Sequence, residues 1–243
     1  MTWHAKPSGG YLRTSVDGID NIFEFRTQLS TWPVECVAGI LGNVEAESGF
    51  NPWRWQGDRF GTSRGYGLFQ YTPASSYLAL SGASPNLSVT EITAGATPQD
   101  ANRQIQAFRT NELGKWVSNC WRSYWNDEHG NPLYADLWSE RTRILNTWGH
   151  GNGISLAEFA DITDIYDACF VFLACFEGPK VPNLGARNTN AAKIYEILTG
   201  VTPPSPPDPP IPPPPPTPIP PMSTPTLLSA TRHKLKQRRI FRC

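Results

Sequence analysis

Two glutamates near the end of one expected helix are the first candidates for chemistry. Glu45 and Glu47 occupy the last turn of a helix predicted over 33–48, and both fall beside its apolar stripe rather than opposite it. A carboxyl at the edge of a buried face loses solvent, and this loss raises its pKa toward neutrality. A carboxylic acid of that kind can protonate a glycosidic oxygen. Helical periodicity leaves a second interpretation open, in which both glutamates are exposed residues at a helix end.

The segment that follows this helix, residues 51–71, alternates glycines with aromatic residues. This composition is typical of short twisted strands and turns, so it predicts a small antiparallel β lobe. Aromatic rings stack on sugar faces, and glycine allows a ligand to approach the backbone closely. We therefore expect the segment to form one wall of a sugar groove, with Asp58 as the first choice for a second carboxylate.

Other catalytic chemistries lack their signatures in this sequence. The four histidines are widely separated, and no pair of them has the spacing of metal ligands. Neither a Gly-x-Ser-x-Gly elbow nor a phosphate-binding glycine loop occurs. We therefore expect neither a metal ion nor a cofactor.

The five cysteines, at positions 36, 120, 169, 175 and 243, have scattered spacings. This spacing fits neither a disulfide framework nor a paired zinc signature, which favours synthesis in a reducing cytoplasm. Cys169 and Cys175 lie in an apolar helical pattern, so we expect both to be buried, unreactive thiols.

Helical patterns dominate the chain up to about residue 200. Thr31 suits the N-cap and Pro33 the first turn of the helix over 33–48. Further helices are expected over 17–29, 74–80, 98–113, 135–148, 163–177 and 190–198. The 163–177 segment is apolar almost all round, which predicts a central buried helix. The fold class expected is α+β, mostly helical with one small β lobe.

Proline marks the C-terminal part of the chain. Fourteen of the 24 prolines lie between Pro203 and Pro221, which predicts a stiff polyproline II spacer. The last dozen positions then carry six basic residues and no acid. These shifts predict an N-terminal arm over 1–10, a folded domain over 11–200, a proline-rich linker over 201–225 and a basic tail over 226–243.

Charge and hydropathy exclude two broad classes. The net charge is zero, with 21 Lys and Arg against 21 Asp and Glu, so the part before the basic tail is slightly acidic. A slightly acidic body argues against a general nucleic-acid binder. No apolar run approaches the ~20 residues of a membrane helix, and the first residues lack a signal-peptide pattern. We expect no membrane association and no export by a signal peptide.

Two ordered motifs resemble a known superfamily. Residues 47–52, Glu-Ser-Gly-Phe-Asn-Pro, and 65–70, Gly-Tyr-Gly-Leu-Phe-Gln, are similar to the paired signature of lysozyme-like proteins and lytic transglycosylases. Segments 39–43, 55–56, 67–75 and 172–179 resemble more specifically the phage tail lysozyme family of short-tailed phages. The resemblance covers about residues 11–198, with an apparent insertion around 112–160, and does not extend to the proline stalk or the tail.

This resemblance implies roles for individual residues. It implies that Glu47 is the catalytic acid, with Glu45 as the runner-up, and that Gln70 lines the sugar groove. Further substrate-binding candidates are Tyr66, Tyr71, Ser48 and Glu177. For the two tyrosines, packing of the lobe against the helices is an equal alternative. For Glu177, the alternative is a buried hydrogen-bonding role at the end of the central helix.

A partner for the catalytic acid is not evident from the sequence. Glycoside hydrolases usually pair the acid with a nucleophile about 5 Å away or a base about 6.5–9.5 Å away. Asp58 is the candidate for that partner. Without one, the N-acetyl group of the substrate would attack internally and give the anhydro product of a lytic transglycosylase.

The resemblance implies a phage tail-associated peptidoglycan hydrolase of the muramidase type on a lysozyme-like fold. It would cleave the β-1,4 bond between N-acetylmuramic acid and N-acetylglucosamine so that the tail can cross the wall during DNA entry. Two alternatives are a non-catalytic structural or wall-binding tail-tip protein and a late-lysis endolysin. The expected location is the virion, at the tail tip or in the tail lumen, after synthesis in the host cytoplasm. The expected partners are glycan strands, other tail proteins through the stalk and basic tail, and packaged DNA at the tail end.

Overall fold

A computed structural model describes residues 3–6, 10–81, 98–149 and 153–205. The expected linker beyond Ser205 and the whole basic tail lie outside the described residues. In chain order, the elements of the described part are α1 (Val16–Gln28), α2 (Val34–Ser48), η1 (Gln56–Asp58), α3 (Ala74–Ser81), α5 (Pro98–Arg109), η2 (Ser123–Trp125), α6 (Ala135–Trp148), α7 (Leu156–Phe159), α8 (Ile165–Phe172), η3 (Leu173–Glu177) and α9 (Leu184–Thr199). The prediction of a mostly helical domain is confirmed.

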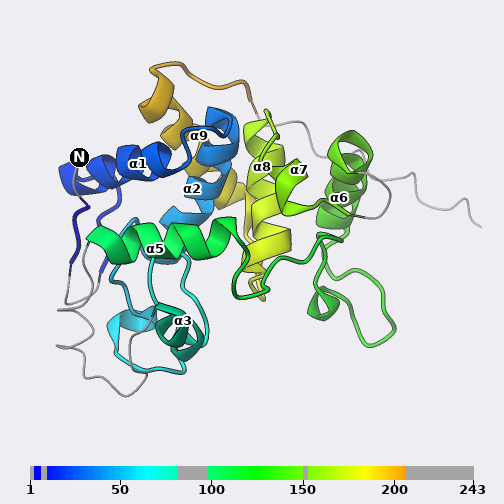
Figure 1. The fold of residues 1–243 in the computed structure, drawn as a ribbon. Coiled ribbons are helices and arrows are strands. Elements are labelled where there is room, and N and C mark those ends of the chain that lie inside the picture. Colours follow the sequence, from blue (N-terminus) through cyan, green and yellow to red (C-terminus); the bar gives the residue numbers. More distant parts are fainter. Residues whose placement is uncertain (1–2, 7–9, 82–97, 150–152, 206–243) are drawn as a thin grey trace, which may run out of the picture. The chain divides into compact units, whose positions relative to one another are not determined.

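Helix α2 lies at the centre of the helical part and packs mainly against α8 and α9 (Figure 1). Two glycines permit this close approach. A Cβ on Gly39 would lie 2.6 Å from the backbone nitrogen of Cys169, and a Cβ on Gly42 would lie 2.7 Å from the backbone oxygen of Arg187. Since no real side-chain carbon fits at such separations, a larger residue at either position would push the helices apart.

The central buried helix predicted over 163–177 forms as α8 and continues directly into η3, a turn of π-helix. Asp164 caps its start, because its carboxylate accepts the backbone N–H groups of Tyr166 and Asp167. All residues of α8 are buried, as the apolar pattern predicts. Gly178, with φ 55°, ends the π-turn in the left-handed conformation that glycine adopts most readily.

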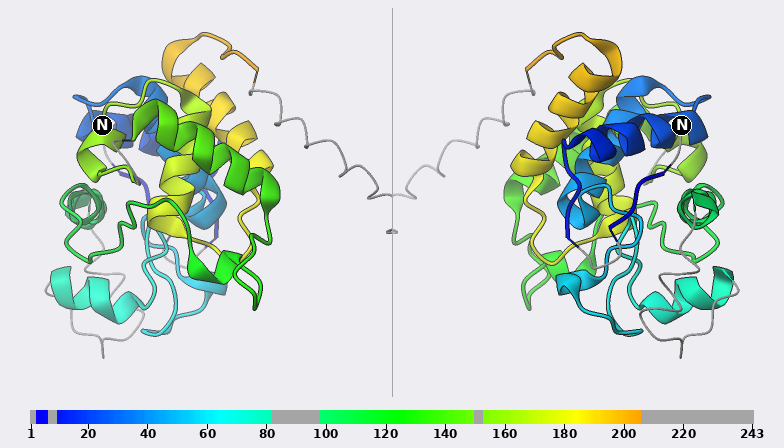
Figure 2. Two further views of the ribbon diagram at one scale, coloured as in Figure 1. Left: turned by 90° about the vertical axis from the view of Figure 1, so that its right-hand side faces the viewer. Right: turned by 90° about the vertical axis from the view of Figure 1, so that its left-hand side faces the viewer.

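The segment predicted as an antiparallel β lobe contains only isolated bridges in the described residues. Trp55 pairs with Tyr66, and Tyr66 pairs with Tyr71, both in antiparallel orientation, while η1 and turns make up the rest. In both views of Figure 2, this cyan segment lies at the bottom together with α3, below α1 and α9. Gly67, with φ 81°, lies so close to α5 that a Cβ at this position would collide with the Gln104 side chain.

Helix α5 holds this lobe through two polar side chains, Asp100 and Gln104. The Asp100 carboxylate accepts the hydroxyl of Tyr66 over 2.9 Å and that of Tyr77 over 2.7 Å. Gln104 donates to the Pro52 carbonyl over 2.8 Å and accepts the backbone N–H of Leu68 over 2.6 Å. Because these groups are buried or partly buried, each bond also prevents a desolvation penalty.

Phe69 joins the lobe to the helical core. Its ring centroid lies 6.0 Å from that of Phe25 on α1, 5.4 Å from Phe108 on α5 and 5.5 Å from Phe176 on η3. Offset and edge-on aromatic pairs at these distances add stabilisation beyond the apolar area that they bury. The lobe therefore shares one core with the helices.

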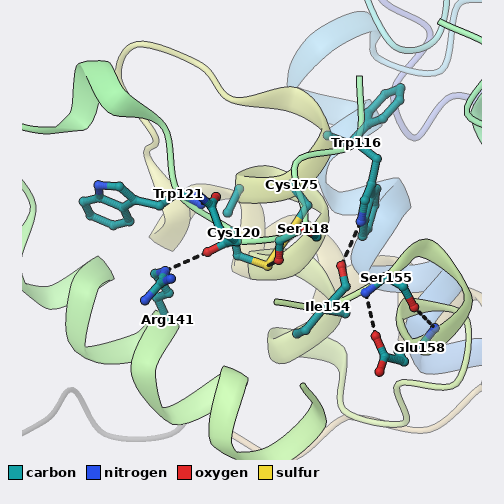
Figure 3. The surroundings of a disulfide bond; sticks show 12 residues. Trp116, Ser118, Cys120, Trp121, Arg141, Ile154, Ser155, Glu158 and Cys175 are labelled. Atoms are coloured by element: carbon teal, nitrogen blue, oxygen red, sulfur yellow. Dashed lines mark hydrogen bonds between the residues drawn. A yellow bond between two sulfur atoms is a disulfide. The ribbon is translucent and has the colours of Figure 1, made fainter. Parts of the chain in front are cut away.

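A disulfide bond between Cys120 and Cys175 connects the segment 110–134 to η3 (Figure 3). The prediction that Cys175 is a free thiol is therefore wrong, and so is the expectation that the cysteines make no disulfide. The two residues are 55 positions apart, and only folding brings their Cα atoms within 4.6 Å. Cys36 and Cys169 are free and buried, so the prediction for Cys169 is confirmed.

Backbone contacts reinforce the disulfide. The N–H of Val117 donates to the Cys175 carbonyl over 2.7 Å, and Arg122 donates to the carbonyls of Ala174, Cys175 and Phe176. The segment 110–134 is thus attached to the turn that carries Glu177.

Replacing Cys120 with serine should lower the free energy of unfolding by about 2–4 kcal/mol, because the crosslink restricts the unfolded chain. Chemical denaturation under non-reducing conditions measures this difference. A reductant should destabilise the wild type to a similar degree and leave Cys120→Ser unchanged. A wild type whose stability is insensitive to reductant would contradict the prediction.

Candidate active site

A cleft of about 560 Å³ opens between the end of α2, the lobe, the segment 110–134 and η3. Polar and charged side chains dominate its lining. The lining residues are Tyr11, Ala46, Glu47, Arg54, Gln56, Gly57, Gln70, Thr72, Lys115, Glu177, Gly178 and Pro179. Two carboxyl groups, from different elements, therefore reach one cavity.

Glu47 enters the cleft from the last turn of α2, which ends at Gly49 with φ 55°. Its side chain is 22% exposed, and Arg187 of α9 donates from Nη2 to its Oε1 over 2.6 Å. A charge-assisted bond of this length fixes the carboxylate and balances its negative charge.

Arg187 is itself held from behind by buried groups. Its Nη1 donates to Oδ1 of Asn43 over 3.0 Å, and its Nε donates to the Pro182 carbonyl over 3.2 Å. Asn43 in turn donates to the carbonyls of Gly39 and Cys169. The guanidinium that reaches Glu47 is thus part of a hydrogen-bonded network joining α2, α8 and α9.

Glu177 enters the cleft from the end of the π-turn. Its Oε1 is shielded from solvent and has no hydrogen-bond partner among the described residues. Burial, followed by the negative charge of Glu47, raises the pKa of Glu177 to about 8. The positive charges of Lys115, Arg187 and Arg122 act in the opposite direction but do not cancel this rise. A carboxyl with this pKa holds its proton at neutral pH.

Lys115 lines the cleft between aromatic rings. Its Nζ lies 5.4 Å from the ring centroids of both Tyr71 and Phe176. Burial lowers its pKa, and the negative charge of Glu177 partly opposes this effect. The ammonium group therefore depends on ring faces and on the neighbouring carboxyls for its stability.

On the lobe side, Arg54 stacks on the ring of Tyr11, with 3.6 Å from its guanidinium carbon to the ring centroid. Its Nε lies 3.3 Å from the carboxylate of Asp58. Gln70 also lines the cleft, and its amide nitrogen donates to the carbonyls of Arg54 and Gly67. The structure thus places Gln70 in the expected groove with its amide nitrogen bonded inside the lobe.

The two alternative carboxylates are not among the residues lining the cleft. Glu45 accepts a hydrogen bond from Asn190 over 2.7 Å and lies 3.8 Å from Arg13. Asp58 accepts the backbone N–H of Gly10 over 2.7 Å, besides its contact with Arg54. The carboxylates of Glu45 and Asp58 therefore bind other segments of the chain.

Three of the predicted substrate-binding residues are buried instead of lining the cleft. Ser48 donates to the Val44 carbonyl of its own helix over 3.1 Å. Tyr66 donates to Asp100, and Tyr71 donates to the Gln104 carbonyl over 2.8 Å. For both tyrosines the structure matches the packing alternative, since their hydroxyls fasten the lobe to α5.

A family model described as phage tail lysozyme matches residues 20–198, which is well over half of the 243 residues. The chain belongs to the phage tail lysozyme family. It is also similar to morphogenesis protein 1 of Bacillus phage B103, with 26% identity over 171 residues, or 70% of this chain and 36% of that protein. The chain thus covers about a third of the length of this curated relative.

Membership of the phage tail lysozyme family confirms the resemblance seen in the sequence and agrees with a lysozyme-like helical fold. The matched range includes Glu47, Lys115, Glu177 and Arg187, whereas Tyr11 precedes it. Within the described residues, no helix is long and apolar enough to cross a membrane. Likewise, no group of histidine, cysteine or acidic residues in this part of the chain could hold a metal ion.

Sequence reasoning missed Lys115, Arg54 and Tyr11 as lining residues of the cleft, and it missed Arg187 as the ion-pair partner of Glu47. Arg187 lies in α9, which begins at Leu184, six residues before the predicted start of that helix. Lys115 lies in the segment interpreted as an insertion. Aromatic neighbours are the local signal that the sequence offers for two of these residues: Arg54 lies between Trp53 and Trp55, and Lys115 precedes Trp116.

Replacing Glu177 with glutamine should change stability in a pH-dependent way. The free energy of unfolding of the variant, relative to that of the wild type, should be higher at pH 8 than at pH 4.5. In the unfolded chain this carboxyl ionises near pH ~4.3, whereas in the folded protein its pKa is about 8. The wild type therefore loses stability as pH rises between these values, and the glutamine variant does not. Thermal unfolding at both pH values measures the effect.

The matched control is Glu128→Gln, because the Glu128 side chain is 87% exposed. We expect this control to unfold like the wild type at both pH values. A difference between Glu177→Gln and wild type that is the same at pH 4.5 and pH 8 would refute the burial of an uncharged carboxyl.

Proposed function

We propose that this protein cleaves the β-1,4 bond between N-acetylmuramic acid and N-acetylglucosamine in peptidoglycan, and that cleavage depends on Glu47. The observation that carries the proposal is the position of Glu47 at the end of α2, in a cleft that contains a second carboxyl, in a chain of the phage tail lysozyme family. Lysozyme-like glycosidases work with such pairs of carboxyl groups.

The remaining lining residues support a carbohydrate ligand. Gln56, Gln70 and Thr72 present amide and hydroxyl groups on the lobe side, and these match the hydroxyl and acetamido groups of an amino sugar. Lys115 of the segment 110–134 adds a positively charged donor, which would recognise the stem carboxylates of peptidoglycan. No cofactor is required for this reaction.

The product distinguishes two reaction types on the same bond. Attack of water on the anomeric carbon gives a product with a reducing end. Internal attack by a group of the substrate gives a product with an anhydro end. Mass spectrometry of the fragments released from purified walls separates these products. If none of the released fragments has a cleaved glycan strand, the proposed function is refuted.

We propose further that the protein is a component of the phage particle and opens the wall during DNA entry. The name of the relative from Bacillus phage B103, a morphogenesis protein, supports a role in the particle. The proline-rich segment and the basic tail would attach the domain to other tail proteins and to packaged DNA.

Replacing Glu47 with glutamine should reduce wall cleavage by at least ~100-fold, because the amide has neither a negative charge nor a transferable proton. Release of fragments from purified walls measures the rate. Glu45→Gln is the matched control, since Glu45 belongs to the same helix turn but not to the cleft lining. Loss of activity in Glu45→Gln with normal activity in Glu47→Gln would show that Glu45 is the essential carboxyl.

Truncation after Ser205 should leave wall cleavage unchanged, because the whole cleft lies within the remaining residues. The same truncation should reduce incorporation of the protein into particles, which immunodetection in purified virions measures. Normal incorporation of the truncated chain would contradict the attachment role of the removed residues.

A further inference from the structure

Arg54 is a buried cation in the wall of the cleft, and the folded protein leaves two of its donor atoms unused. The residue is 7% exposed and lines the cleft. Its Nε and Nη1 are both buried, and neither donates a hydrogen bond to a described residue. Buried polar groups in folded proteins are almost always paired. An unpaired guanidinium beside a cavity therefore points to an acceptor that a ligand supplies.

The arginines that fix the other walls of the cleft use their donors within the protein. Arg122 donates to three backbone carbonyls of the π-turn. Arg187 donates to Glu47, to Asn43 and to a backbone carbonyl. Unused donors therefore distinguish Arg54 from both of them.

Asp58 balances the charge of Arg54 only in part. Its Oδ1 lies 3.3 Å from the Nε of Arg54, but the two atoms make no hydrogen bond. The Asp58 side chain is 47% exposed, and its Oδ1 accepts the backbone N–H of Gly10 over 2.7 Å. Because an ion pair with an exposed partner contributes little, the guanidinium can bind a second anion.

Tyr11 covers one face of this guanidinium. The ring centroid of Tyr11 lies 3.6 Å from the guanidinium carbon of Arg54. The two residues after Tyr11 donate their backbone N–H groups to the Gly49 carbonyl over 2.9 Å each, and a Cβ on Gly49 would lie 2.3 Å from the Tyr11 ring. The ring is thus packed against the end of α2. Since the N–H groups of a guanidinium lie in its plane, a ring on its face leaves them for a planar anion.

The charges of the cleft favour a negatively charged ligand. Glu47 is paired with Arg187, and burial raises the pKa of Glu177 to about 8, so that this carboxyl is uncharged at neutral pH. Arg54 and Lys115 therefore leave an excess of positive charge on the lining. Each N-acetylmuramic acid carries a lactyl carboxyl, which is either free or joined to a stem peptide with carboxylates of its own. A neutral polymer of N-acetylglucosamine has no such group.

We propose that Arg54, held by Tyr11, binds a carboxylate of the N-acetylmuramic acid unit and thereby makes the cleft specific for peptidoglycan over neutral amino-sugar polymers. This inference rests on the proposed function and names the substrate group that its cleft recognises. Arg54 acts on substrate binding, and cleavage still depends on Glu47.

Soluble peptidoglycan strands separate recognition from cleavage. Uncrosslinked strands without phosphate polymers are tested before and after their carboxyl groups are converted to methylamides. The readout is the ratio of kcat/KM on free strands to kcat/KM on blocked strands. A second pair of substrates is prepared from strands whose stem peptides an amidase has removed. An effect confined to the stem-bearing pair identifies a stem carboxylate as the ligand, and an effect confined to the stripped pair identifies the lactyl carboxylate.

In Arg54→Gln this ratio should be at least ~10-fold lower than in the wild type on one of the two pairs, because a hydrogen bond to a charged group is lost. Each ratio compares one protein on two substrates, so a partial loss of folded protein cancels. Arg59→Gln is the matched control, since Arg59 is an exposed arginine of the same lobe and is not among the lining residues. The control should have the wild-type ratio.

Tyr11 provides a second test that needs no variant at Arg54. Tyr11→Ala removes the stacked ring and should lower the ratio about 3-fold. Tyr11→Phe retains the ring and should restore the ratio. A role of Tyr11 in folding alone would lower the rates on free and blocked strands together and leave their ratio unchanged.

Three results would overturn the inference while leaving the proposed function intact: a wild-type ratio in Arg54→Gln, an equally lowered ratio in Arg59→Gln, or a wild type that cleaves free and blocked strands equally well. If Arg54→Gln does not fold, an unchanged ratio in Tyr11→Ala overturns it. A wild type that cleaves none of the strands would overturn the proposed function instead.

Discussion

The buried contact between Asn43 of α2 and Arg187 of α9 connects the cleft to the helical core. It depends on Gly39 and Gly42, which let α2 approach its two neighbours at backbone distance. A polar pair in an apolar core is stable only when its hydrogen bonds are made, and Asn43 uses its donors on the carbonyls of two helices. Arg187 is therefore held in place before any ligand arrives. The position of Glu47 follows from core packing rather than from the surface of the cleft.

The other walls of the cleft are held by different forces. The lobe is attached through the polar side chains of α5 and the aromatic cluster around Phe69, whereas the segment 110–134 is attached through a disulfide and through Arg122. The π-turn is the meeting point, since its carbonyls accept Arg122 and its last residue is Glu177. An inserted residue in a helix commonly marks a functional position, and here it ends a buried helix with a carboxyl directed into the cavity.

The sequence predicted the helices far better than the cleft. Apolar periodicity located α2 and α6 to within a residue, because each buries one stripe against a common core. The motif that ends α2 identified Glu47 and the groove beside it. The sequence could not predict the roles of Arg187 and Lys115, since only tertiary packing brings Arg187 to Glu47 and Lys115 into the cleft. The disulfide was not predicted for the same reason, since only folding brings Cys120 and Cys175 together. The lobe has turns and isolated bridges in place of regular strands, and side chains of α5 bond to it.

The contact at Tyr166 has a mechanical meaning for a domain followed by a proline-rich segment. Its hydroxyl donates to the Pro204 carbonyl over 2.7 Å, so the chain leaving α9 is fastened to the first turn of α8. A pulling force applied beyond Pro204 would reach the domain at the central helix before it could unwind α9 from its free end. Helix α8 is buried along its whole length, and the load would spread into the core as shear between packed helices. Until this single hydrogen bond breaks, it gives tension a second point of entry at α8, besides the covalent connection through α9.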